Sequence, residues 1–157
     1  MRLRLLGLAL AQLALVGVAV APQLVSRTTG EDYLMRVQPL DPIDPFRGAY
    51  VTLHYPDLQE PGGSRPPSMD DGERGDVFVT LVEEDGFWVM EERTRTRPED
   101  GPYLACDDRS WQVRCGIESY FVPQDRASEM EQALADGGVA TVRIDSRGVA
   151  TVVSVDP

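Results

Sequence analysis

The residues of this chain best suited to chemistry are a few carboxylates at two places in the sequence. Asp41 and Asp44 each precede a proline, and Glu118 stands in the largely aliphatic and aromatic run 116–123. Carboxylates gathered in a cleft can transfer protons in a hydrolytic reaction. A carboxylate paired with an arginine instead stabilises a fold without reacting. We favour this second interpretation for Glu118, with Arg47 as its expected partner, and we predict no catalytic residue.

Two cysteines and one histidine are the other reactive side chains. Cys106 and Cys115 would lie within disulfide reach if they stood on opposite arms of a hairpin, and export would place them in an oxidising compartment. We predict a disulfide, with two unpaired core cysteines as the alternative. With His54 the cysteines offer at most three soft metal ligands, without CxxC spacing. No metal site or other cofactor is therefore predicted.

The charge of the chain excludes several classes of function. All 15 basic residues are arginines, so neither Schiff-base chemistry nor a Ser-Lys dyad is available. The 26 acidic residues give a formal net charge of −11, which repels nucleic acid and anionic lipid headgroups. Gly-rich phosphate loops and a GxSxG elbow are missing from the sequence. We therefore expect no nucleic-acid partner.

The N-terminus carries the strongest topological signal. Residues 3–21 are apolar except for Arg4 and Gln12, and as a helix they would extend about 28 Å, close to the hydrocarbon thickness of a bilayer. Arg2 and Arg4 precede the run and should keep the N-terminus cytoplasmic. The predicted division is a signal-anchor transmembrane helix at 3–25, a linker at 26–30 and an extracytoplasmic β domain at 31–157.

Two features of the apolar run leave alternatives open. Ala19-Val20-Ala21 has the small-x-small pattern of a signal-peptidase site, but Pro22 would follow the cut, and we favour the uncleaved anchor. Gln12 is polar at membrane depth, where an amide needs a partner. It could mark a contact with another transmembrane helix, or it could be a tolerated polar residue in an ordinary alanine-rich segment.

The exported part is predicted to be mainly β. Alternating apolar residues with turn signals between them indicate consecutive antiparallel strands and one short helix, arranged as a small sandwich or a partly closed barrel. Asp85-Gly86 is a hairpin signal. The expected strands cover 31–38, 49–55, 76–83, 87–94, 103–105, 111–122, 139–145 and 149–155, with a helix at 125–136 and a polar loop at 56–74.

The segment 39–55 is the most distinctive stretch. Its two Asp-Pro steps stiffen the backbone, and Phe46 and Arg47 lead to a corner at Gly48. A strand with alternating faces follows, and one face consists of Ala49, Val51, Leu53 and Tyr55.

Together these residues resemble the GDYXXLXY family of bacterial membrane-anchored proteins. The signature falls on Gly48, Tyr50, Leu53 and Tyr55, with Ala49 in place of its aspartate. A second match is the run 116–123, GIESYFVP, which includes Glu118, Tyr120 and Phe121. The resemblance covers roughly residues 30–155 and implies an anchored, mostly β domain without an established activity.

The same resemblance implies a partner, because such proteins are often encoded near multi-span membrane proteins. We expect an extracytoplasmic binding or assembly domain that acts with an integral membrane protein. One alternative is an envelope hydrolase using carboxylates, which a cleft gathering Asp41, Asp44 and Glu118 would favour. Another is a sensor of an ion or small molecule. The sequence does not determine the oligomeric state.

Overall fold

The structure is a computed structural model that describes residues 9–20, 29–39, 50–59, 74–110, 112–123 and 126–157. The predicted mainly β fold with one short helix is confirmed for the described residues from 29 onward. Its elements are β1 (Glu31–Pro39), β2 (Tyr50–His54), η1 (Pro56–Leu58), β3 (Asp76–Glu84), β4 (Phe87–Thr94), β5 (Tyr103–Asp107), β6 (Ser119–Phe121), α2 (Ala127–Ala133), β7 (Gly138–Ile144) and β8 (Ala150–Asp156).

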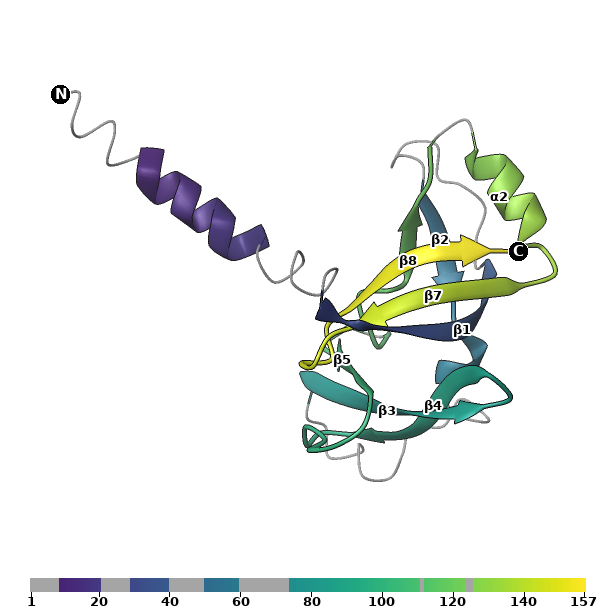
Figure 1. Cartoon of the computed structure of the whole chain (residues 1–157), viewed down its shortest axis with the longest axis horizontal. Helices are drawn as coiled ribbons and strands as arrows, with labels where there is room; N and C mark the ends of the chain where they lie inside the picture. Colours follow the sequence, from purple (N-terminus) through teal and green to yellow (C-terminus); the bar gives the residue numbers. More distant parts are fainter. Residues whose placement is uncertain (1–8, 21–28, 40–49, 60–73, 111, 124–125) are drawn as a thin grey trace.

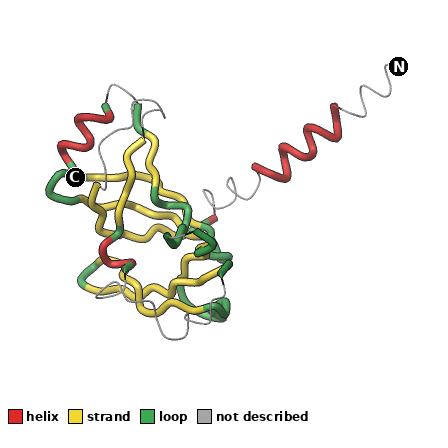
Figure 2. Tube along the Cα trace, turned by 180° about the vertical axis from the view of Figure 1, so that it is seen from behind, coloured by secondary structure: helices red, strands yellow, loops and turns green. Residues whose placement is uncertain are grey.

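The strands form two antiparallel sheets, which Figures 1 and 2 show from opposite sides. One sheet has five strands in the order β6-β2-β1-β7-β8, and the other has three in the order β4-β3-β5. Among the described strands no ladder joins the two sheets, so they do not close into a barrel. Hairpins account for the neighbours β3–β4 and β7–β8, whereas β2 and β6 are far apart in the sequence.

A hydrophobic core lies between the sheets. It is built from the side chains that alternate to the inner face of each strand. Both sheets contribute buried side chains, because every second residue of a strand points to the same face. The ring of Tyr33 on β1 meets Trp88 on β4 edge to face, with centroids 4.9 Å apart. The predicted inner face of β2 is confirmed for its described members Val51, Leu53 and Tyr55, all buried.

The β3–β4 turn follows the predicted hairpin chemistry. Asp85 and Gly86 connect the strands, and both have positive φ, at 52° and 84°. A two-residue turn with positive φ at both positions matches the twist of the strands that it joins. The Asp-Gly signal is therefore confirmed as a hairpin.

Two predicted elements are wrong in extent. Within the described residues 112–122 of the strand expected at 111–122, only Ser119–Phe121 form a strand, because Gly116 adopts a positive φ of 82° and turns the chain before β6. The helix expected at 125–136 is shorter, Ala127–Ala133, and Leu134 follows it as a fully buried residue.

The predicted polar loop at 56–74 needs a correction at its described ends. It begins with η1, whose Leu58 packs against the core. At the other end Arg74 donates to the backbone carbonyls of Asp108 and Ser110, at 3.1 and 3.0 Å. These two ends are therefore tied to the fold, and residues 60–73 lie outside the described part.

Residues 9–20, within the apolar run, are helical. In the part of the chain that the structure describes, no helix combines the length and apolar character needed to cross a membrane.

The β7–β8 turn depends on one buried carboxylate, that of Asp145. It accepts hydrogen bonds from the backbone N–H groups of Arg147 and Val149, at 2.9 and 3.0 Å, and pairs with the Arg147 guanidinium at 2.7 Å. Burial alone would raise the pKa of Asp145, but the hydrogen bonds from Arg147 and Val149 outweigh it and lower that pKa. The ionised form is therefore favoured in the folded chain.

Asp145 should accordingly make stability depend on acid pH. Because its folded pKa is lowered, its contribution is present above its ordinary pKa of 3.8 and is lost as pH falls through the folded value. We expect Asp145→Asn to lower the free energy of unfolding at neutral pH by about 1 kcal/mol. Urea denaturation at pH 7 and pH 3 measures this, and a cost equally large at both pH values would contradict it.

Candidate functional site

The two sequence motifs come together as neighbouring strands. β2 pairs with β6, placing Val51 opposite Tyr120 and Thr52 opposite Ser119. The N–H of Leu53 donates to the carbonyl of Glu118 at 2.9 Å, just before the ladder. We call the contact between β2 with Tyr55 and the segment 115–121 the motif seam. It brings Tyr50–Tyr55 of the first motif against residues 116–121 of the second.

Tyr55 anchors the seam from the β2 side. Its side chain is buried, and its hydroxyl donates to the carbonyl of Ile117 at 3.0 Å. Burial, and then the negative charge of Glu118, raise the pKa of Tyr55 well above its ordinary value. The phenol therefore stays protonated and remains a hydrogen-bond donor.

This raised pKa predicts a loss of stability in alkali. Because the folded pKa lies above the ordinary value of 10.0, Tyr55 contributes its full stability below pH 10 and loses it as pH rises toward the folded pKa. We expect the advantage of the natural chain over Tyr55→Phe to be constant from pH 7 to 9 and to shrink above pH 10. Urea titrations of both chains test this, and an advantage that grew in alkali would contradict it.

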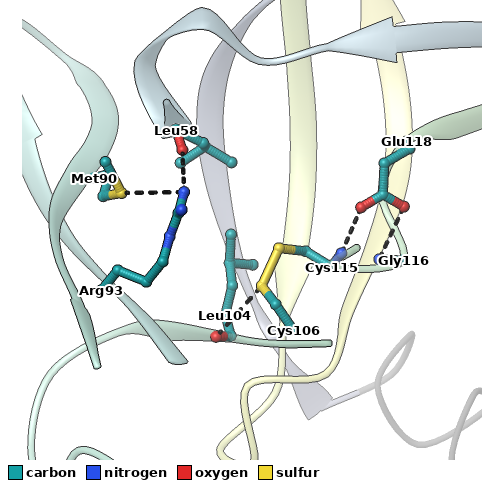
Figure 3. The surroundings of a disulfide bond; sticks show 8 residues. All are labelled: Leu58, Met90, Arg93, Leu104, Cys106, Cys115, Gly116 and Glu118. Carbon is teal, nitrogen blue, oxygen red and sulfur yellow. Dashed lines mark hydrogen bonds between the residues drawn. A yellow bond between two sulfur atoms is a disulfide. The ribbon is translucent and has the colours of Figure 1, made fainter. Parts of the chain in front are cut away.

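Glu118 closes the turn that leads into β6. Its carboxylate accepts hydrogen bonds from the backbone N–H of Cys115 and, at 3.1 Å, from that of Gly116, as Figure 3 shows. The expected partner Arg47 lies outside the described residues. Carboxylate oxygens engaged by backbone donors fix a turn, which supports a structural role for Glu118.

Cys106 and Cys115 form a disulfide that joins β5 to the start of the seam (Figure 3). The adjoining residues Asp107 and Arg114 exchange both of their backbone hydrogen bonds, each 2.8 Å long. The cysteines are thus the next, directly opposed pair, with Cα atoms 4.1 Å apart. The bond ties the three-stranded sheet to the five-stranded one.

The other predicted site residues have diverse positions. Leu53 is buried, Tyr120 packs partly buried against the core, and the Phe121 ring on β6 is 79% exposed. His54 is half-buried. Gln12 lies exposed in the helical residues 9–20, and Tyr50 pairs opposite Phe121.

The predicted residues outside the described part are Asp41, Asp44, Phe46, Arg47, Gly48 and Ala49. Among the described residues, no group of three or more His, Cys, Asp or Glu could hold a metal ion.

The sequence did not reveal a buried ion pair beside the seam. Asp108 is buried and pairs with Arg95 at 2.7 and 3.1 Å, and it also accepts the N–H of Gly75 at 2.8 Å. These contacts of Asp108 hold the end of β5 against the start of β3 and the end of β4. Asp108 follows another aspartate in a polar run, and that pattern is typical of a solvated turn.

Fold and seam together define a mainly β domain whose two motifs build one strand pairing. A family model described as GDYXXLXY protein matches residues 12–155. The chain belongs to this family. The match begins within the apolar run, further toward the N-terminus than the resemblance from about residue 30. No curated protein and no solved structure matches the chain significantly.

Proposed function

We propose that this chain is a membrane-anchored extracytoplasmic domain that binds, or helps to assemble, an integral membrane protein. Residues 3–25 would be the uncleaved transmembrane anchor and 31–157 the exported domain. The apolar composition of the N-terminal run, the helical residues 9–20 and a family match that starts inside this run support the anchor.

The observation that carries the binding role is that the residues of the motif seam differ in their exposure and in what they contact. Leu53 and Tyr55 are used in packing, and Glu118 is used in a turn. Phe121 instead presents a large apolar ring, 79% exposed, on β6 at the edge of the five-stranded sheet. Exposed aromatic side chains are favoured contact residues in protein interfaces.

The charge and the tether favour a membrane protein as the partner. A net charge of −11 disfavours docking on anionic lipid headgroups and favours a basic extracytoplasmic loop. A membrane anchor would hold the domain beside proteins of the same membrane, which raises their effective concentration. The Phe121 face would then contact such a loop.

Site-specific photo-crosslinking in native membranes tests this proposal. A photoreactive phenylalanine analogue would replace Phe121 in one chain and Val153 in a control chain. Val153 lies on β8, the opposite edge strand of the same sheet, and is 42% exposed. We expect position 121 to give one discrete adduct with an integral membrane protein, whereas position 153 gives none.

The removal of residues 3–25 provides a second arm of this experiment. The shortened chain, directed to the same compartment by a cleavable signal peptide, should give a weaker adduct from position 121 because the tether is lost. Equal adducts from 121 and 153, or none from either, would contradict the proposed binding face.

A further inference from the structure

We propose that a hollow at the start of β1 binds the headgroup of a zwitterionic lipid, phosphatidylethanolamine, with the Glu31 carboxylate and the Tyr33 hydroxyl accepting hydrogen bonds from its ammonium group. This inference rests on the proposed anchor, which would hold this end of the domain beside the lipid headgroups. Three observations carry it, namely the polar groups that face the hollow, the charges around it and its place beside the linker.

The hollow has a volume of about 400 Å³ and is lined from both sheets. Glu31 and Tyr33 of β1 and Ile144 at the end of β7 belong to the five-stranded sheet, whereas Pro102 leads into β5 of the three-stranded sheet. Glu31 is paired opposite Ile144, and Figure 1 shows the start of β1 beside the end of β7. The hollow therefore lies where this end of the larger sheet meets the approach to β5.

Two oxygen acceptors of β1 face the hollow. Every second residue of β1 turns toward the three-stranded sheet, so that Tyr33 meets Trp88 of β4, and Met35 and Val37 are buried. Glu31 is the first residue of this series and is exposed, which places its carboxylate at the mouth of the hollow. The Tyr33 hydroxyl donates to that carboxylate at 3.2 Å.

The Tyr33–Glu31 pair suits an N–H cation. Burial, followed by the hydrogen bond to Glu31 and the charge of that carboxylate, raises the pKa of Tyr33, so the hydroxyl keeps its proton and donates it to Glu31. At 3.2 Å apart, the phenolic and carboxylate oxygens can both accept from one ammonium group. No arginine in the described part of the chain pairs with Glu31, although arginines pair with Asp32 and Asp145 close by.

The side of the hollow formed by the β7–β8 turn carries guanidinium groups. Arg97 donates through Nε to the Tyr103 hydroxyl at 2.6 Å and through Nη2 to the Ser146 carbonyl at 3.2 Å, and both acceptors belong to lining residues. Arg147 binds the lining residue Asp145 through Nε and Nη2. These contacts leave the Nη1 group of each guanidinium able to donate to a phosphate oxygen. A carboxylate on β1 with guanidinium groups at the turn complements a zwitterion better than a simple cation.

The hollow also lies where the linker enters the domain. Gly30 packs against its wall, because a side chain at this position would come within 2.6 Å of the Ile144 carbonyl oxygen. The predicted linker 26–30 spans at most about 18 Å, so an anchor that ends at residue 25 would keep the hollow near the headgroups. A headgroup without net charge is not repelled by the −11 charge of the chain. The tether therefore favours a lipid over a soluble zwitterion.

Carbodiimide coupling in reconstituted vesicles tests this proposal. The full-length chain is placed in vesicles of phosphatidylethanolamine and phosphatidylcholine, and a water-soluble carbodiimide joins carboxylates to primary amines in contact with them. The chain has no lysine, so apart from its N-terminus the lipid supplies the only primary amine. Peptide mass should show lipid on Glu31 at about ten times the yield on Glu99, an exposed glutamate near the hollow but outside its lining. Equal yields would overturn the proposal.

A second arm separates recognition of the headgroup from closeness to the bilayer. The same chain in detergent receives glycerophosphoethanolamine, or ethanolamine without the phosphate. We expect Glu31 to couple about fivefold faster with the first, because Arg97 and Arg147 would hold the phosphate. Equal rates would overturn the zwitterionic ligand. In native membranes, coupling of Glu31 to a protein lysine in place of lipid would overturn the lipid assignment.

A matched pair of variants tests the second acceptor. Tyr33→Phe keeps the ring and should lower the yield of lipid on Glu31 by about fivefold, the effect of losing one hydrogen bond. Tyr120→Phe makes the same change on β6, outside the lining of the hollow, and should leave the yield unchanged. Equal yields from the two variants would overturn the role of the Tyr33 hydroxyl. Because coupling reports contact with lipid, these outcomes are independent of crosslinking from position 121, which reports a protein partner.

Discussion

Replacing Tyr55 with alanine should lower the free energy of unfolding by about 3–5 kcal/mol, the range for truncation of a large buried aromatic side chain. Tyr55 is buried in the core, and its hydroxyl satisfies the carbonyl of Ile117. The substitution would leave a cavity and an unpaired carbonyl in the motif seam. Urea denaturation followed by tryptophan fluorescence measures the change.

Tyr55→Phe is the matched control, because it keeps the ring and removes only the hydroxyl. It should cost about 1 kcal/mol, the typical net value of one hydrogen bond. If alanine and phenylalanine had the same small effect, Tyr55 would not anchor the seam. If Tyr55→Ala left stability intact but abolished crosslinking from position 121, the motif tyrosine would be a contact residue.

Removing the disulfide should have the second largest effect. We expect Cys106→Ala combined with Cys115→Ala to lower the free energy of unfolding by roughly 2–3 kcal/mol, because a short closed loop restricts the unfolded chain. The bond joins β5 to the segment that enters β6, so its loss also loosens the motif seam. Urea denaturation without reductant gives the value.

The natural chain denatured with and without reductant is the control for this variant. Under reductant it should lose about as much stability as the double substitution removes. If neither treatment moved the midpoint, the disulfide would contribute nothing to the fold.

Much of the fold was predictable because its causes are local. Alternation of apolar residues along β2 and β3 requires only that one face of a strand be buried, and Asp85-Gly86 can supply the two positive φ angles of its turn without help from distant residues. The proximity of Cys106 and Cys115 followed from a hairpin-like return of the chain between them. The motif residues Leu53 and Tyr55 fell on the buried face for the same periodic reason.

The contacts of the candidate site were less predictable because they depend on backbone geometry. The carboxylate of Glu118 meets the N–H groups of Cys115 and Gly116 only because Gly116 turns the chain with a positive φ. From the sequence alone, a distant arginine was an equally reasonable partner for the Glu118 carboxylate. The Asp108–Arg95 pair depends in addition on how β4 and β5 flank β3. Neither contact has a spacing signal in the sequence.

The central claim is that a membrane helix tethers this β domain outside the cytoplasm. Protease treatment of spheroplasts that carry the full chain, with an epitope placed after Pro157, tests it most directly. We expect the epitope to be lost from the membrane fraction while a cytoplasmic marker stays intact. An epitope that survives until the membrane is permeabilised would contradict the account.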